Sequence, residues 1–291
     1  MKKLISVAVL LTVTVSAFAQ SKAEPYFTFK ELPNMLKWAP APPDTVGAAF
    51  TYDIMQYMWG KQMRLDKERA DIAYRDAEYS LECIAREFSE PFGLTISEEN
   101  TPEIWTLLRD AKATFEAIGG FPKYYYKRKR PFMRFNEPTL APQYEPDLRR
   151  NFSYPSGHTI FGWGTALLLT EINPERADTI LARGMMYGES RVIVGAHWQS
   201  DVDAGRLAAA AAYARMHTSE RFLEQMRLAR QEFRIKTGLA IIVEMKTFNK
   251  ALKKAKKAKV CLTLKNVESK TTFKDGDKRK FRIVGVAGAR I

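Results

Sequence analysis

The chain has 291 residues, of which 46% are hydrophobic and 12% aromatic, so it can bury a sizeable core and lacks the composition of a disordered protein. The formal net charge is +13, but residues 239–291 carry 15 basic and four acidic side chains, whereas residues 20–238 carry 29 of each. The charge of the main body therefore gives no support to a general nucleic-acid-binding role.

The N-terminus has the pattern of a cleaved signal peptide. Lys2 and Lys3 precede an apolar stretch over residues 4–15, and Ala17-Phe18-Ala19 forms a small-x-small cleavage site. The apolar stretch is shorter than the ~20 residues that span a bilayer. We expect residues 1–19 to be removed, leaving a mature periplasmic chain without a transmembrane anchor.

The first part of the mature chain predicts a strap followed by helices. Residues 20–43 are rich in proline and irregular. Asp44 is a candidate N-cap for a helix over residues 44–61, and apolar periodicity predicts a second helix over residues 67–88.

The middle of the chain contains glycine and proline signals that predict helix boundaries. Thr101-Pro102 is a typical helix start, and Gly119-Gly120 predicts the end of that helix. Five prolines between positions 122 and 146 predict a long loop over residues 121–154.

Helices are predicted again over residues 156–171, 174–188, 197–216 and 219–236. No alternating strand pattern occurs between residues 20 and 238, so this segment is predicted to be one all-α, multi-helix domain.

The composition changes after Gly238. Residues 241–259 have the pattern of a basic amphipathic helix, and residues 260–267 and 280–286 alternate as the strands of a hairpin would. Two roles for the basic extension at 239–291 stay open: contact with an anionic lipid or nucleic-acid surface, or a passive appendage. The chain has two cysteines, Cys83 and Cys261, and whether they pair also stays open.

Two histidines lie in short segments that suit phosphate chemistry. In "SRVIVGAHWQSD", residues 190–201, His197 and Asp201 are four residues apart and would share one face of the predicted helix. Asp201 can accept a hydrogen bond from one ring nitrogen, which leaves the other nitrogen free to act as a nucleophile. Arg191, predicted on the turn entering that helix, can bind phosphate oxygens in bidentate fashion.

The segments "KYYYKRKRP" (123–131) and "PSGH" (155–158) supply complementary groups. Gly157 allows close backbone approach to an anion, the N-terminus of the following helix offers N–H donors, and the Ser156 hydroxyl adds another donor. His158 is a candidate proton donor to a leaving oxygen, and Lys123 and Arg130 add positive charge. Each feature alone has an ordinary structural interpretation, but their joint occurrence suits phosphoryl transfer.

The complete pattern, KX6RP…PSGH…SRX5HX3D, resembles the signature of the type 2 phosphatidic acid phosphatase superfamily, which vanadium haloperoxidases share. "SYPSGH", "GESRVIVGAHWQSDVDAGR" and "YDIMQYMWGKQMRLDKERADIAYRDA" are similar to secreted bacterial class A non-specific acid phosphatases. The resemblance covers residues 20–236. It implies an all-α bundle that hydrolyses small phosphate monoesters with broad specificity, without a metal, another cofactor or a nucleic-acid partner.

The resemblance also assigns roles to individual residues. It implies that His197 forms a phosphohistidine, Asp201 orients His197 and His158 protonates the leaving alcohol. The residues implied to hold the phosphate are Lys123, Arg130, Ser156, Gly157 and Arg191, together with His158. Related enzymes are often homo-oligomers, which leaves the assembly of this chain open.

Two other activities are compatible with the same signature. Lipid or isoprenyl-diphosphate phosphatases usually carry several membrane spans, whereas none is predicted in this mature chain. Vanadate-dependent haloperoxidases are usually longer than this chain. We therefore expect a periplasmic acid phosphatase, with an acidic optimum because His158 must be protonated while His197 attacks in its neutral form.

Overall fold

The computed structural model describes residues 22–239 and Lys250. Within this part no residue belongs to a β-strand, which confirms the all-α prediction there. The signal peptide predicted at residues 1–19 and the hairpin predicted in the C-terminal extension lie outside the described residues, as does the predicted amphipathic helix apart from Lys250. No helix in the described part is both long and apolar enough to cross a bilayer.

The α-helices are α1 (Ala48–Met63), α2 (Lys67–Arg75), α3 (Leu81–Phe92), α4 (Pro102–Tyr126), α5 (Pro131–Phe135), α6 (Glu145–Arg149), α7 (Gly157–Ile172), α8 (Ala177–Val194), α9 (Gln199–Met216) and α10 (Glu220–Lys236). Short 3-10 turns are η1 (Met35–Lys37), η2 (Pro142–Tyr144) and η3 (Pro174–Arg176).

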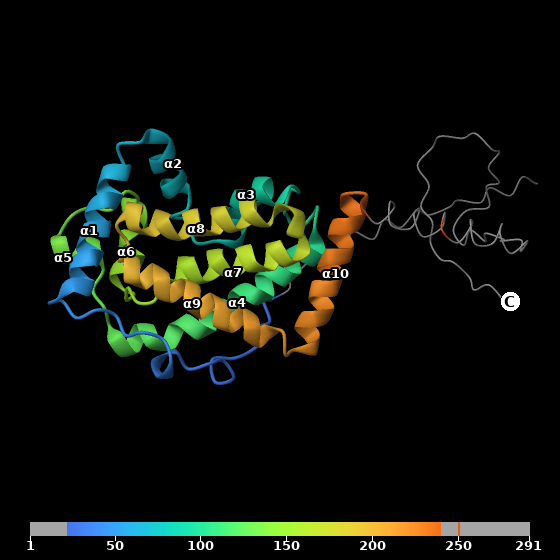
Figure 1. Ribbon diagram of the computed structural model, residues 1–291, viewed down its shortest axis with the longest axis horizontal. Coiled ribbons are helices and arrows are strands. Elements are labelled where there is room, and N and C mark those ends of the chain that lie inside the picture. The colour runs from blue at the N-terminus through green and yellow to red at the C-terminus, as the bar shows by residue number, and fades with distance from the viewer. Residues whose placement is uncertain (1–21, 240–249, 251–291) are drawn as a thin grey trace, which may run out of the picture.

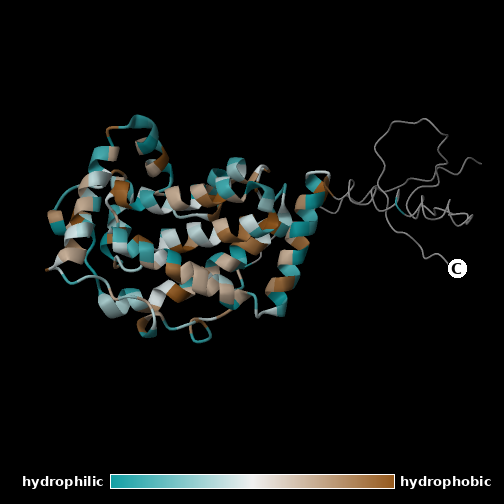
Figure 2. Cartoon of the chain, in the orientation of Figure 1, coloured by the Kyte–Doolittle hydropathy of each residue, from teal (hydrophilic) through white to brown (hydrophobic). Residues whose placement is uncertain are grey.

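Helix α7 lies at the centre of the bundle, with α4, α8 and α9 packed around it (Figure 1). It is apolar around most of its circumference, as expected for a helix enclosed by others, and Figure 2 shows the contrast with the more hydrophilic α2 and α10. Close packing depends on Gly164: a Cβ at this position would lie 2.2 Å from Cζ of Phe115 on α4.

The directions of these four helices bring the predicted site residues to one end of the bundle. α4 and α8 end there, and α7 and α9 begin there (Figure 1). The two helix N-termini contribute partial positive charge and free backbone N–H groups at the same end. Helix α10 packs across the opposite end against α4 and α7.

Several predicted boundaries in the first half were wrong. The first helix begins at Ala48 after Gly47, and Asp44 accepts a hydrogen bond from the backbone N–H of Thr45 instead of capping it. The helix predicted over residues 67–88 is divided into α2 and α3, because the chain turns at residues 76–80. Asp76 is buried at this turn and forms an ion pair with Arg183 on α8.

The predicted stop at Gly119-Gly120 was also wrong, because α4 continues through Pro122 to Tyr126. Gly119 serves close packing: a Cβ there would lie 2.6 Å from Cδ1 of Ile160 on α7. The region predicted as a loop over residues 121–154 contains the end of α4 together with α5, η2 and α6. Three of its five prolines, Pro131, Pro142 and Pro146, stand in the first turns of α5, η2 and α6, where the missing N–H costs little.

The later helices agree better with the sequence. Ser156 and Ser219 are the N-caps of α7 and α10, as the predicted starts require. The helix predicted over residues 174–188 is longer and consists of η3 followed by α8. The helix predicted over residues 197–216 begins at Gln199, so His197 precedes it.

Candidate active site

Six of the eight predicted site residues line one cavity of about 640 Å³, and five of them do so through charged or imidazole side chains: Lys123, Arg130, His158, Arg191 and His197. Gly157 also lines it, at the start of α7. The residues come from the end of α4, the segment before α5, the start of α7, the end of α8 and the segment before α9. The sequence pattern therefore corresponds to a single site.

Lys123 lies in the last turn of α4 and is tethered to the chain that precedes α7. Its Nζ donates hydrogen bonds to the carbonyl oxygens of Phe152, at 3.1 Å, and Pro155, at 2.5 Å. Burial, reinforced by the positive charges of Arg130 and Arg191, lowers the pKa of Lys123 to about 7. The amine is held in position without a carboxylate partner in these contacts.

Arg130 is the N-cap residue of α5 and is only 2% exposed. Four backbone carbonyl groups accept hydrogen bonds from its guanidinium: those of Leu148, Asn151, Phe152 and Ala196. Burial lowers the pKa of Arg130 to about 9, which still leaves the group charged at neutral pH. This carbonyl cage fixes the guanidinium at the cavity wall.

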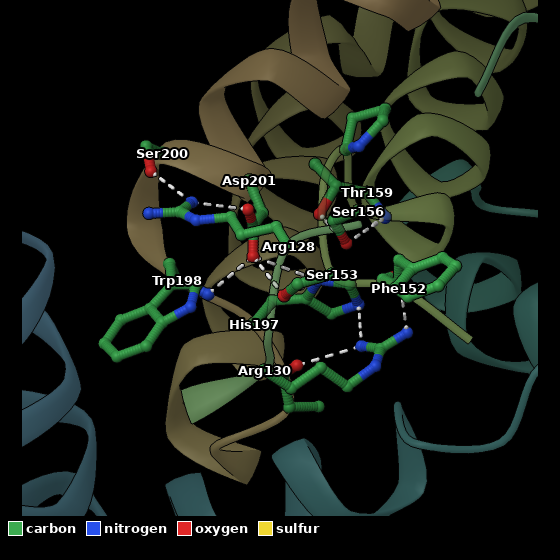
Figure 3. A network of polar contacts seen from close by, with 12 residues as sticks. Arg128, Arg130, Phe152, Ser153, Ser156, Thr159, His197, Trp198, Ser200 and Asp201 are labelled. Atoms are coloured by element: carbon green, nitrogen blue, oxygen red, sulfur yellow. Dashed lines mark hydrogen bonds and ion pairs between the residues drawn. The ribbon is translucent and has the colours of Figure 1, made fainter. Parts of the chain in front are cut away.

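The contact between Arg130 and His197 determines which nitrogen of the imidazole carries the proton (Figure 3). Nη1 of Arg130 lies 2.8 Å from Nε2 of His197. A guanidinium can only donate, so Nε2 accepts with its lone pair and the neutral ring carries its proton on Nδ1. Nδ1 lies 3.4 Å from the hydroxyl oxygen of Ser153, which accepts a hydrogen bond from it in this tautomer, and 3.4 Å from Oδ2 of Asp201, to which the same hydroxyl donates.

The prediction that His197 and Asp201 share a helical face was wrong in its local geometry. His197 precedes α9, whereas Asp201 lies in the first turn of α9 and accepts a hydrogen bond from the backbone N–H of Trp198 at 2.9 Å. The capping contact bends the chain so that the imidazole still faces the carboxylate. Burial, followed by the charges of Arg130, Lys123 and Arg191, lowers the pKa of His197 well below its usual range, so the ring is neutral at neutral pH.

His158, in the first turn of α7, is held by the turn between α2 and α3. Its Nε2 lies 3.1 Å from the carbonyl oxygen of Ala77, and its ring packs against Tyr79 with centroids 4.6 Å apart. The carbonyl can only accept, so Nε2 carries the proton. Burial, with the charges of Arg191 and His197, lowers the pKa of His158 well below 6.5, so the ring is neutral at neutral pH.

Arg191 lies in the last turn of α8, which corrects the prediction that placed it on a turn entering the next helix. Its Nη1 donates to the carbonyl oxygen of Asp76 at 3.4 Å, while its Nε is buried without a hydrogen-bond partner. Burial lowers the pKa of Arg191 to about 10. A buried N–H donor without a partner is costly unless a ligand accepts its hydrogen bond. Such a donor in a cavity wall therefore favours the binding of an anion.

Two predicted residues lie behind the cavity wall. Asp201 is fully buried and contacts His197 from the side away from the cavity. The oxygen of Ser156 accepts hydrogen bonds from the backbone N–H and the hydroxyl of Thr159, at 3.3 and 2.9 Å. In this arrangement the Ser156 oxygen caps α7.

Sequence reasoning missed two residues that contact Asp201. The hydroxyl of Ser153 donates to Oδ2 of Asp201 at 2.5 Å, and Nη1 of Arg128 donates to Oδ1 at 2.6 Å. Arg128 lies in the "KRKR" run, in which Lys127 and Lys129 are exposed while Arg128 and Arg130 point inward. Alternate residues of an extended segment point to the same side. Because Arg130 was expected to point into the site, Arg128, two residues earlier, could have been predicted to point inward as well.

Anion binding is the chemistry that this cavity favours. Lys123, Arg130 and Arg191 converge on it, and their hydrogen bonds within the described structure go to backbone carbonyls and to His197. Within the same described residues, no group of three or more His, Cys, Asp or Glu side chains is arranged to hold a metal ion.

Comparisons with known proteins agree with this chemistry. Residues 110–223 match the family model of the PAP2 superfamily. The chain is 41% identical to the non-specific acid phosphatase of Salmonella typhimurium over 221 residues, which cover 74% of this chain and 86% of that protein. It is 41% identical to the non-specific acid phosphatase of Providencia stuartii over 69% of this chain and 81% of that protein. It is 32% identical to an acid phosphatase of Zymomonas mobilis over 76% of this chain and 83% of that protein. With its site residues gathered in one cation-lined cavity and these similarities over most of its length, the chain belongs to the PAP2 superfamily and, within it, to the non-specific acid phosphatases.

Proposed function

We propose that residues 20–238 hydrolyse small phosphate monoesters in the periplasm through a covalent phosphohistidine on His197, without a metal ion. The observation that carries this proposal is the orientation of His197: Nε2, with its lone pair, faces the cationic cavity while Nδ1 faces Asp201. An imidazole held in this way is a competent nucleophile toward phosphorus. The export step rests on the signal-peptide pattern at residues 1–19.

Lys123, Arg130 and Arg191 would bind the non-bridging oxygens of the phosphate. Buried charges are normally compensated, and a bound dianion would compensate these three. The backbone N–H groups at the start of α7, near Gly157, add donors where helix N-termini commonly bind phosphate. The same groups would stabilise the charge that spreads over the equatorial oxygens in the transition state.

The reaction then proceeds in two displacements. Nε2 of His197 attacks phosphorus as Arg130 shifts its hydrogen bond from the imidazole to a phosphate oxygen. The P–O bond to the alcohol breaks, and His158 donates a proton to the leaving oxygen. In the second step His158 accepts a proton from water, the resulting hydroxide attacks phosphorus, the P–N bond breaks and inorganic phosphate leaves.

The protonation of His158 couples substrate binding to catalysis. Without a bound anion, burial and nearby cations keep its pKa low, so the ring carries a single proton, on the Nε2 that faces the Ala77 carbonyl, and Nδ1 has none to donate. The negative charge of a bound phosphate dianion stabilises the protonated ring against both its burial and the repulsion from nearby cations. Binding of the dianion therefore raises the pKa of His158. This coupling, together with the neutral His197, favours activity at acidic pH.

The direct test is trapping of the intermediate. The enzyme is mixed with p-nitrophenyl phosphate and quenched within milliseconds in alkaline denaturant, because the P–N bond is labile to acid, and its peptides are analysed by mass spectrometry. We expect one added phosphoryl group on the peptide that contains His197. His197→Ala should abolish the modified peptide and lower kcat by several orders of magnitude.

His217→Ala is the matched control, because His217 lies at the end of α9 and contacts Tyr213 and Glu171, away from the cavity. This variant should retain both the phosphopeptide and the activity. Near-normal turnover in His197→Ala would refute the assignment of the nucleophile.

A further inference from the structure

Three charged residues form a buried chain behind the nucleophile. Arg128, just after α4, donates from Nη1 to Oδ1 of Asp201 and from Nη2 to Oδ2 of Asp53 on α1, each at 2.6 Å. Both carboxylates are fully buried, and the side chain of Arg128 is 9% exposed. Figure 3 shows the guanidinium of Arg128 beside Asp201, on the side away from Arg130.

Asp53 is in turn attached to the first turn of α9. Its Oδ1 accepts from the backbone N–H of Ser200 at 2.8 Å, and its Oδ2 accepts from the Ser200 hydroxyl at 2.6 Å. Nη1 of Arg128 also donates to that hydroxyl at 2.7 Å. The planar guanidinium, which also packs over Trp198, thereby joins α1 to the turn that carries Asp201.

The two carboxylate oxygens of Asp201 have different partners. Arg128 binds Oδ1, whereas Oδ2 accepts from Ser153 and from the backbone of Trp198 and faces Nδ1 of His197. With Oδ1 held, the carboxylate cannot rotate away from the imidazole without breaking a buried, charge-assisted hydrogen bond.

We propose that Arg128, held by Asp53, is a positioning residue for the His197–Asp201 pair, so that turnover depends on the docking of α1 against the start of α9. Arg128 does not line the cavity and acts only through Asp201. The inference rests on the proposed roles of His197 and Asp201. A purely structural ion pair would affect folding stability instead of the rate of the folded enzyme.

The test compares Arg128→Gln, Asp201→Asn and the double variant, with kcat and KM measured on p-nitrophenyl phosphate and corrected for the folded fraction. Loss of a partner that orients a metal-ligating side chain typically costs roughly 10- to 100-fold in activity, and by analogy we expect a loss of that size in kcat of Arg128→Gln. KM and the inhibition constant of inorganic phosphate should change by less than about twofold, because the cavity cations are retained. In the Asp201→Asn background, Arg128→Gln should cost less than about twofold more, because both changes act through one carboxylate.

Two further variants keep the test informative if Arg128→Gln does not fold. Arg128→Lys retains the charge but has no planar fork to bridge two carboxylates, and Asp53→Asn removes the brace while retaining Arg128. Both should lower kcat by less than Arg128→Gln and show the same non-additivity with Asp201→Asn. The matched control is Arg221→Gln, which breaks an ion pair with Asp110 on another part of the bundle and should leave kcat unchanged.

The outcomes separate the two proposals. If Arg128→Gln, or the two milder variants in its place, keeps kcat within about twofold of the parent, or if its loss multiplies with that of Asp201→Asn, the positioning role is refuted. If Asp201→Asn and His197→Ala themselves retain parental activity, the proposed function fails instead.

Discussion

Binding of a dianion to the empty cavity should draw a proton onto Lys123. The Nζ group has a pKa of about 7 because it is buried beside Arg130 and Arg191. At pH 8 such an amine is only about 10% protonated. A bound dianion returns its pKa toward the ordinary value of 10.5, so Lys123 takes up as much as ~0.9 proton on binding at this pH. His158 and His197 are neutral at pH 8 before binding, and any proton that the anion draws onto them adds to this number and persists in a Lys123 variant.

The assay is isothermal titration calorimetry with sulfate at pH 8 in Tris and in HEPES, two buffers with different ionisation enthalpies. Sulfate is chosen because it has no titrating proton of its own near this pH. The dependence of the apparent enthalpy on the buffer gives the number of protons taken up. By linkage, the Kd for sulfate should also rise at least about tenfold between pH 8 and pH 9, and more steeply above pH 9, where Arg130 with its pKa of about 9 loses its proton as well.

Lys123→Met should abolish most of the uptake. Lys236→Met is the matched control, because Lys236 lies in the last turn of α10, at the opposite end of the bundle, and donates to the side chain of Asn100. That variant should retain the parental proton number. An uptake below about 0.2 proton in the parent protein, or an equal uptake in Lys123→Met, would refute the electrostatic description of the cavity.

Three further predictions test other parts of the structure. His158→Ala should lower kcat much more for alkyl phosphates than for p-nitrophenyl phosphate, whose leaving group needs no proton; equal losses would argue against His158 as the acid. EDTA should leave activity unchanged, and an inhibition reversed by zinc or magnesium would contradict the metal-free mechanism. Gly164→Ala should lower the free energy of unfolding by ~1–3 kcal/mol in thermal denaturation, because the new Cβ would overlap Phe115. Gly120→Ala, with nothing within 4 Å of its new Cβ, should raise it by ~0.5–1 kcal/mol, and equal effects would contradict the packing argument.

The sequence identified the cavity residues because their chemistry restricts their identity. The roles proposed for them, namely a histidine nucleophile paired with a carboxylate, arginines for phosphate oxygens and a glycine at a helix start, leave recognisable spacings. The structure gathers Lys123, Arg130, His158, Arg191 and His197 in one cavity, although local helix geometry did not predict correctly how His197 meets Asp201.

The features that the sequence did not predict depend on contacts between distant parts of the chain. The break between α2 and α3 lies where Asp76 forms an ion pair with Arg183, and the spacing of apolar residues cannot predict that pair. Gly119 reads as a helix stop locally, yet it allows α4 to approach Ile160. Arg128 differs from its basic neighbours because Asp53 and Asp201 approach it from two other helices.

The cations around the cavity favour the activity of the enzyme but lower the stability of the folded chain. Lys123, Arg130 and Arg191 repel one another in a poorly solvated space, and the folded chain bears that repulsion at acidic pH, where Lys123 is protonated, until an anion binds. Replacing one of them with an apolar side chain of similar length would relieve the repulsion and yield a hardier but inactive protein. The framework of helices could then reach a higher heat resistance than the active enzyme has, and inorganic phosphate, by binding in the cavity, should raise the stability of the folded chain.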